Sequence, residues 1–201
     1  MASRSHPSHA KTLLTLLAAA WLVLAPRPAR ADDAAVLEAL RAGRVAILLR
    51  HSQTTPGVGD PPGWKLDDCS TQRNLNAEGR AHARRLGAWF KRRQVVPTAV
   101  LSSPWCRTRE TARLAFGRSR DWPALANLFE NREPAKENAE QVRRYIADLR
   151  SGDIAVLVSH GSSIHAMVGE YLGQGEAVVV RAERDARGAI RTILVGRIVV
   201  P

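Results

Sequence analysis

The chain has 201 residues, 45% of them hydrophobic, and a formal net charge of +11. This length suits a single domain with a substantial hydrophobic core, and the lack of an internal repeat or low-complexity tract excludes a repeat architecture. The positive charge would suit nucleic acid, anionic lipid or a phosphorylated substrate. Because most of it comes from scattered arginines with few aromatic residues among them, we expect no nucleic-acid surface.

The first 31 residues have the pattern of a secretory signal peptide. Arg4 and Lys11 form a positive start, residues 12–24 form an apolar stretch, and Ala29 and Ala31 are the small residues that a signal peptidase reads. An uncleaved N-terminal anchor is the alternative, although the apolar stretch is short for one. We therefore expect a periplasmic or secreted protein with no stable membrane insertion after cleavage. Its mature domain would span residues 32–201 and carry +7, because four basic residues leave with the signal.

The first half of the mature chain predicts helices alternating with strands. Residues 34–42 form a predicted helix closed by Gly43, and residues 44–49 are an apolar run typical of a strand buried on both faces. After a long loop, Asn76 is a predicted N-cap for a helix that reaches about residue 93. A short strand at residues 99–101 leads into a helix that ends near residue 116, with Ser103 as its cap and Pro104 at its first position.

The second half continues this alternation and ends in two strands. We expect irregular structure at residues 118–134, a helix at 136–149 and a second fully buried strand at 154–158. Residues 159–161 form a turn into another helix, whose apolar face extends to Tyr171 and Leu172. Residues 176–182 and 190–199 predict two strands joined by a charged turn. The expected fold class is α/β, a three-layer α/β/α sandwich with a mostly parallel central sheet.

Histidine and arginine follow the two most apolar strands. Arg50 and His51 come directly after the first, and His160 and Gly161 come after the second, while Arg107 lies near the start of the helix between them. In such sheets ligands bind outside the carboxyl ends of the strands, where helix N-termini also favour anions. The sequence therefore predicts an anion site built from two histidines and two arginines at one edge of the sheet.

Phosphoryl transfer would use all four of these side chains. Arginine matches phosphate oxygens with two hydrogen bonds, and a neutral imidazole is a competent nucleophile toward phosphorus. A second, protonated histidine would stabilise the transition state. A metal site is the competing use, but His160 and His165 are five positions apart and no acidic pair lies at ligand spacing. We expect no metal and no cofactor, and we expect His82 and His165 to lie on the surfaces of their helices.

Three motifs resemble those of the histidine phosphatase superfamily, whose fold is phosphoglycerate mutase-like. They are Arg50-His51-Ser52-Gln53-Thr54, then Ser102-Ser103-Pro104 with Arg107-Thr108 and Thr111-Ala112, and finally Ser159-His160-Gly161. They occur in the family order, each between a strand and a helix, and the resemblance extends over essentially the whole mature chain. It implies a metal-independent phosphomonoester hydrolase that acts through a phosphohistidine intermediate.

Carried over to this sequence, the resemblance assigns roles to the motif residues. His51 would be the nucleophile, Arg50 and Arg107 would bind the phosphoryl oxygens, and His160 would stabilise the transition state. Further substrate contacts would come from Thr54, Arg73 and Gly161. Ser52 stands where many members have glycine.

The proton donor for the leaving oxygen is less well marked. Mutase-type members have a glutamate in an acidic, glycine-containing stretch that is missing from this chain, which favours hydrolysis over mutase activity. Glu130 is our candidate donor, with Glu133 and Asp68 as the next choices.

The two cysteines, Cys69 and Cys106, both lie in the mature domain. An even pair in an oxidising compartment usually bonds, and two buried free thiols are the alternative. A disulfide would attach the loop expected to cover the site to the helix that carries Arg107.

The partner that follows from these interpretations is a small phosphorylated substrate or a phosphorylated glycan, such as a sugar phosphate or phosphorylated lipopolysaccharide core. Two other functions stay open. One is a non-catalytic protein that binds phosphate or polyanions in a retained pocket. The other is a phosphatase acting on phosphohistidine in proteins, which fits poorly with export.

Overall fold

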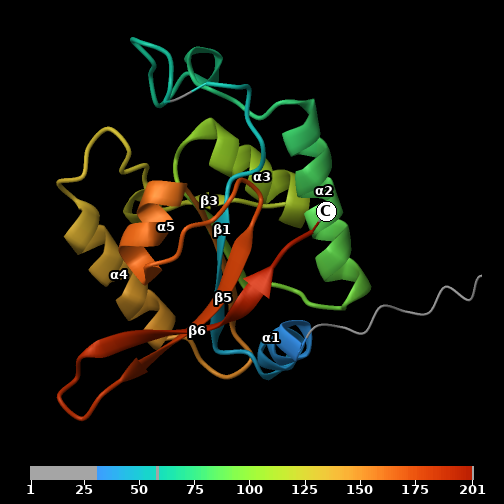
Figure 1. Cartoon of the computed structure of the whole chain (residues 1–201), viewed down its shortest axis with the longest axis vertical. Coiled ribbons are helices and arrows are strands. Elements are labelled where there is room, and N and C mark those ends of the chain that lie inside the picture. The colour runs from blue at the N-terminus through green and yellow to red at the C-terminus, as the bar shows by residue number, and fades with distance from the viewer. Residues whose placement is uncertain (1–30, 58, 201) are drawn as a thin grey trace, which may run out of the picture.

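The computed structural model describes residues 31–57 and 59–200 (Figure 1). Apart from Ala31, the predicted signal peptide lies outside these residues. The helices are α1 (Ala31–Ala42), α2 (Ala77–Arg92), α3 (Cys106–Phe116), α4 (Ala135–Ala147) and α5 (Gly161–Val168), with short 3₁₀ turns at Cys69–Thr71 and Pro123–Leu125. The strands are β1 (Val45–Arg50), β2 (Ala99–Ser102), β3 (Arg120–Asp121), β4 (Ile154–Ser159), β5 (Ala177–Arg184) and β6 (Ile190–Ile198).

The strands form one six-stranded sheet in the order β3-β2-β4-β1-β5-β6. The first four strands in this order pair in parallel, whereas β5 and β6 are antiparallel and form a long hairpin that projects from the body of the molecule (Figure 1). The predicted mostly parallel sheet is confirmed. The predicted charged turn between the last two strands joins β5 to β6, where Gly188 adopts a positive φ of 81°.

Helices cover both faces of the sheet, as the predicted three-layer sandwich requires. Alternate residues of β1 supply the two cores: Ala46 and Leu48 pack with α4 and α5, whereas Val45, Ile47 and Leu49 pack with α1, α2 and α3. This arrangement explains why β1 and β4 appear in the sequence as continuous apolar runs, since a strand covered on both faces has no solvent-exposed side to mark with polar residues.

Local chain signals set some element boundaries well and others poorly. Asn76 caps α2 as predicted, with its side chain accepting a hydrogen bond from the N–H of Gly79. The predicted Ser103 cap is wrong: α3 begins at Cys106 after Trp105, and no side chain caps it. The predicted extension of α5 to Leu172 is also wrong, because Gly169 ends the helix in the left-handed conformation with a φ of 77°.

The segment predicted to be irregular, residues 118–134, contains the two-residue strand β3 at the edge of the sheet. A strand this short has no periodicity from which it could be predicted. In the described residues, 31–57 and 59–200, no helix has the length and hydrophobicity needed to span a membrane.

Candidate active site

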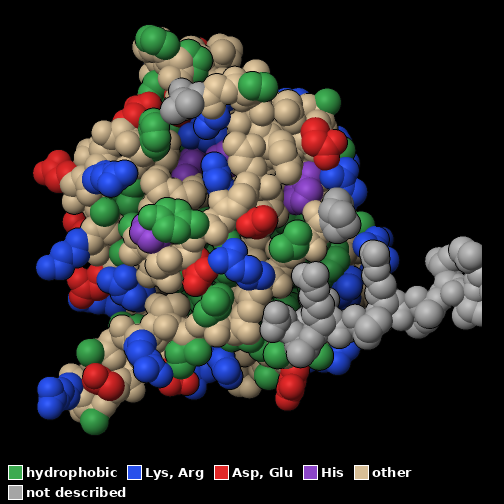
Figure 2. Space-filling model, in the orientation of Figure 1, with side chains coloured by type: hydrophobic (Ala, Val, Ile, Leu, Met, Phe, Trp, Pro, Cys, Tyr) green, Lys and Arg blue, Asp and Glu red, His purple; other side chains and the backbone are tan. Residues whose placement is uncertain are grey.

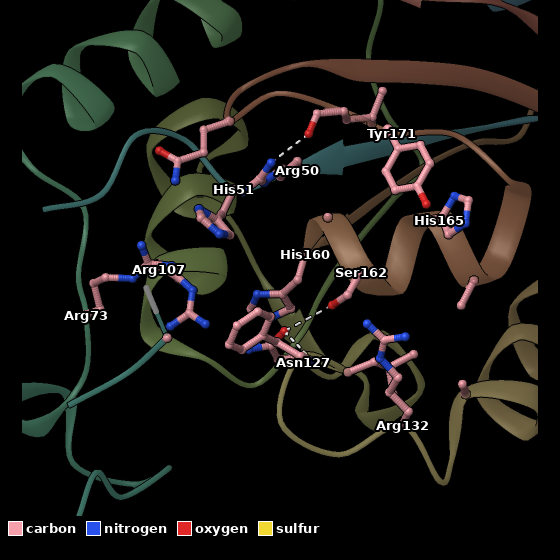
Figure 3. A pocket seen from close by; sticks show the side chains of 18 of the residues that line it. Arg50, His51, Arg73, Arg107, Asn127, Arg132, His160, Ser162, His165 and Tyr171 are labelled. Atoms are coloured by element: carbon pink, nitrogen blue, oxygen red, sulfur yellow. Dashed lines mark hydrogen bonds between the residues drawn. The ribbon is translucent and has the colours of Figure 1, made fainter. Parts of the chain in front are cut away.

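The carboxyl ends of three adjacent parallel strands bring the predicted residues together. In the register of the sheet, Arg50 at the end of β1 lies beside Ser159 at the end of β4, and Ser102 ends β2 on the other side of β4. The residues that follow, His51, His160 and Ser103, are therefore adjacent at one edge of the sheet. Figure 3 shows the His51 and His160 rings facing the same cavity, with Arg50, Arg73 and Arg107 around them.

The position of His51 suits a nucleophile. Its ring nitrogen Nδ1 lies 2.9 Å from the carbonyl oxygen of Ser52, so Nδ1 carries the hydrogen and donates it, which leaves the lone pair on Nε2. Burial, followed by the charges of Arg107 and Arg50, lowers the pKa of His51 to about 3, although the bond to Ser52 acts in the opposite direction. The ring is therefore neutral at physiological pH, as attack on phosphorus requires.

His160 is the second buried imidazole of the site. Its Nε2 lies 2.8 Å from the Ser103 hydroxyl, its ring meets the Trp105 ring edge to face, and its centroid is 5.5 Å from that of His51. Burial, and then the charge of Arg107, lowers the pKa of His160 well below its ordinary value. The expected protonated form is therefore not the resting form of this ring.

Three arginines that line the cavity each have a buried donor without a hydrogen-bond partner in the described part of the chain. The Nε groups of Arg50, Arg73 and Arg107 are buried and have no hydrogen-bond partner among the described residues. Burial lowers the pKa of both Arg50 and Arg107, but guanidinium stays charged in proteins. Buried, unpaired charged donors are costly, so they favour an anion that would satisfy them.

Gly161 allows Arg50 to approach the start of α5. The Arg50 Nη1 donates to the carbonyl of Leu172, beyond the end of α5, at 2.7 Å. A Cβ at Gly161 would lie 3.3 Å from the Arg50 guanidinium carbon, so a larger residue would require the guanidinium to shift by a few tenths of an ångström. The first N–H groups of α5 also have no acceptor inside the helix.

Asp60 is a site residue that the sequence did not reveal. Its Oδ1 accepts hydrogen bonds from the Arg107 Nη1 at 2.7 Å and from the N–H of Arg73 at 2.9 Å, while Oδ2 accepts from the Trp105 Nε1 at 3.1 Å. The side chains of Asp60 and Arg107 are 0% and 1% exposed, so this is a fully buried ion pair. The one available signal was a lone acid in the glycine- and proline-rich loop, which has no periodicity.

The predicted disulfide between Cys69 and Cys106 is confirmed, with a Cα–Cα distance of 5.7 Å. It attaches the loop that carries Asp60 to the first residue of α3, directly before Arg107. A second tie acts at the same place, since the Gln72 side chain accepts a hydrogen bond from the N–H of Cys106.

The cavity above the strand ends has a volume of about 690 Å³, which exceeds the needs of a phosphoryl group alone. At its base are His51, His160 and three arginines, and Arg132, Phe129, His165 and Tyr171 line it further out. Figure 2 shows histidine and arginine side chains gathered in a hollow below the loop at the top of the view. In the described part of the chain, His, Cys, Asp and Glu form no group of three or more that could hold a metal ion.

A sequence model of the histidine phosphatase superfamily (branch 1) matches residues 46–130, which include β1, the Asp60 loop and α3. This matched segment belongs to the histidine phosphatase superfamily. Membership supports a phosphatase activity. No curated protein sequence matches the chain.

Several solved structures share this fold but are distant in sequence. A putative phosphohistidine phosphatase from Agrobacterium tumefaciens is 20% identical, with a TM-score of 0.51 over 78% of this chain and 98% of its own. A mycobacterial glucosyl-3-phosphoglycerate phosphatase is 18% identical, with a TM-score of 0.53 over 76% and 97% of the two chains. A phosphoserine phosphatase from Entamoeba histolytica is 15% identical, with a TM-score of 0.53 over 76% and 95%. At these identities the likeness shows the fold alone.

Two predicted site residues, the motif residue Thr54 and the candidate proton donor Glu130, are not among the residues that line the cavity. Thr54 is buried, and its hydroxyl and N–H are both bonded to the Gln174 side chain, which itself lines the cavity. Glu130 is exposed at the rim, where Oε2 accepts from the Trp64 Nε1 at 3.2 Å. Its charge nevertheless reaches Arg107, since it opposes the lowering of the Arg107 pKa.

The two histidines predicted to lie on helix surfaces do not. His82 is 5% exposed and lies between the Ser52 hydroxyl and the Val200 carbonyl. His165 is half-buried, stacks on Tyr171 at 3.9 Å between ring centroids, and lines the cavity above the strand ends. Helical spacing alone did not reveal either environment, because the partners come from distant parts of the chain.

Proposed function

We propose that this protein is a metal-independent phosphomonoester hydrolase that works through a phosphohistidine on His51. The observation that carries the proposal is a neutral, buried imidazole with its Nε2 lone pair available, beside three arginines whose Nε donors lack partners in the described chain. A phosphoryl dianion supplies both the electrophile for this nitrogen and the acceptors for these donors.

In the first step the Nε2 lone pair attacks phosphorus, an N–P bond forms, and the P–O bond to the leaving alcohol breaks. Arg50, Arg73 and Arg107 stabilise the charge on the equatorial oxygens. His160 adds a ring N–H, and a bound dianion among these groups favours the protonated form of this ring. The Nδ1 hydrogen stays on its bond to the Ser52 carbonyl and fixes the ring throughout.

The leaving oxygen takes a proton in this step, and Glu130 at the rim is the proposed donor. In the second step the same carboxylate, now ionised, accepts a proton from a water molecule while the water oxygen attacks phosphorus. The N–P bond then breaks, the electron pair returns to Nε2, and inorganic phosphate leaves. Asp60 is not a good donor, because its two oxygens already accept three hydrogen bonds.

We propose export to the periplasm or outside, with a small phosphorylated molecule or phosphorylated glycan as substrate. The disulfide supports an oxidising compartment. The cavity volume of about 690 Å³ supports an ester with a sizeable organic group. Gly161 would contact the substrate directly, and Thr54 would hold the Gln174 side chain, which lines the cavity.

The alternative is a non-catalytic protein that binds phosphate or polyanions in the same pocket. The rim position of Glu130 favours it, because this carboxylate is exposed to solvent and already accepts a hydrogen bond from Trp64.

The test is hydrolysis of an aryl phosphate by residues 32–201 in the presence of EDTA, beside His51→Asn. We expect turnover that resists the chelator and falls about a thousandfold or more in the variant, while the thermal unfolding midpoint of the variant shows that it is folded. Phosphate binding without turnover of the aryl ester or a panel of sugar phosphates would favour the binding protein. Turnover that survives in His51→Asn would exclude His51 as the nucleophile.

A further inference from the structure

Asp60 is a buried carboxylate to which the proposed reaction assigns no step, yet it contacts several groups of the site. It bonds Arg107 through Nη1, Arg73 through its main-chain N–H, and Trp105 through Nε1. Trp105 in turn packs its ring against His160, with 5.4 Å between centroids. One side chain therefore links the start of α3 to the loop at Arg73, beside the place where phosphorus would react.

The bond to Nη1 determines which edge of Arg107 faces the cavity. A guanidinium is planar and rigid, so an acceptor on Nη1 fixes the direction of its other edge, formed by Nε and Nη2. The Nε group is buried and unpartnered among the described residues. That edge has the fork geometry that matches two phosphate oxygens.

The loop that holds Asp60 is itself held in place. The disulfide of Cys69 and the hydrogen bond of Gln72 both end at Cys106, one residue before Arg107. The Arg73 Nη1 also donates to the Gly57 carbonyl at 2.5 Å, within the same loop. These contacts hold the loop on both sides of Asp60 and so fix the position of its carboxylate relative to the start of α3.

We propose that Asp60 is a positioning residue: it holds Nη1 of Arg107 and thereby presents the Nε–Nη2 edge to the phosphoryl group in the transition state. This role rests on the proposed function. Its charge also offsets repulsion between the clustered arginines, because it lies against Arg107 and the main chain of Arg73. Asp60 does not touch the reacting atoms, so its effect passes through Arg107.

The perturbation is Asp60→Asn, which preserves shape and one acceptor but removes the charge and places an amide N–H₂ opposite a donor. Asp121→Asn is the matched control. Asp121 on β3 pairs with Arg109, which lies on α3 like Arg107, but this pair is partly exposed and away from the cavity. Trp105→Phe is a second variant that removes only the hydrogen bond to Oδ2 while keeping an aromatic ring beside His160. It serves if Asp60→Asn does not fold.

The readouts are calorimetric affinities for orthovanadate, which adopts the five-coordinate transition-state geometry, and for tetrahedral inorganic phosphate, together with kcat and KM on an aryl phosphate. We expect Asp60→Asn to weaken vanadate about 10–100-fold but phosphate about threefold or less, and to lower kcat more than it changes KM. Asp121→Asn should change none of these. Trp105→Phe should show the same pattern as Asp60→Asn with a smaller loss.

A double-mutant cycle tests the route through Arg107. In an Arg107→Lys background, Asp60→Asn should cost no more than about a further twofold, because the edge that it orients is gone. Losses that multiply in the double variant, or equal losses for vanadate and phosphate, would overturn the positioning role. Binding that follows the expected pattern in a protein without turnover would refute the hydrolase and keep the role of Asp60. Normal turnover and normal vanadate affinity in Asp60→Asn would refute the positioning role of Asp60 and leave the proposed hydrolase standing.

Discussion

Removal of the Cys69–Cys106 disulfide, by reduction or by the double variant Cys69→Ala/Cys106→Ala, should destabilise the fold by an amount that the structure allows us to estimate. The cysteines are 37 positions apart, for which the loop-entropy relation gives about 3.8 kcal/mol at 25 °C. For a domain of this size that corresponds to a fall of about 8–15 °C in the thermal unfolding midpoint.

The assay is thermal unfolding of residues 32–201 with and without a phosphine reductant, beside the double variant in both conditions. We expect the reduced wild type and the variant to coincide, and the reductant to leave the variant unchanged. Because the disulfide ties the Asp60 loop to α3, both should also lose kcat at temperatures where they remain folded.

Two results would contradict these roles of the disulfide. A midpoint that does not move after complete reduction, verified by thiol titration, would mean that the loop is held without the disulfide. A loss of stability with full retention of kcat would mean that the disulfide stabilises the fold without organising the site.

Three further results follow from the structure. Since the pKa of His51 falls from 6.5 to about 3 on folding, the unfolded chain binds a proton between these pH values that the folded chain does not. The free energy of unfolding should therefore decrease as pH falls from about 6.5 toward 3, by up to about 1.4 kcal/mol per pH unit. In urea titrations, the free energy of unfolding of His51→Asn should depend less steeply on pH. Arg107→Ala leaves the buried Asp60 charge uncompensated, so it should lower the free energy of unfolding in urea by about 3–5 kcal/mol. Arg109→Ala breaks a partly exposed pair and should lower it by less than about 1 kcal/mol. Similar losses for both variants would contradict the burial of the Asp60–Arg107 pair. Gly79→Ala would place a Cβ 1.9 Å from the Gln53 carbonyl oxygen, so it should cost about 2 kcal/mol or more, and a neutral result would mean that the start of α2 can move away.

The sequence was sufficient for the features that depend on local pattern. The runs that became β1 and β4 are apolar on both faces, and parallel pairing then brings Arg50, His51 and His160 to one edge whatever the loops do. The N-cap of α2 at Asn76 was equally local.

The missed features depend on contacts between distant segments. Asp60 meets an arginine 47 positions away, and no spacing rule connects the two. Ser103 has the chemistry of a cap, but its hydroxyl bonds a histidine 57 positions away. The predicted surface position of His82 was wrong for the same reason, since its partners are Ser52 and the main-chain carbonyl of Val200.

Capture of the covalent intermediate is the decisive test for a phosphohistidine on His51. The protein is mixed with a phosphomonoester substrate in EDTA, quenched in alkali within the first turnover, and digested for mass spectrometry. We expect an acid-labile, alkali-stable phosphoryl group on the peptide that contains His51, absent from His51→Asn. Turnover with the phosphoryl group on another residue, or with none on His51 while product appears in a burst, would contradict the assignment of His51 as the nucleophile.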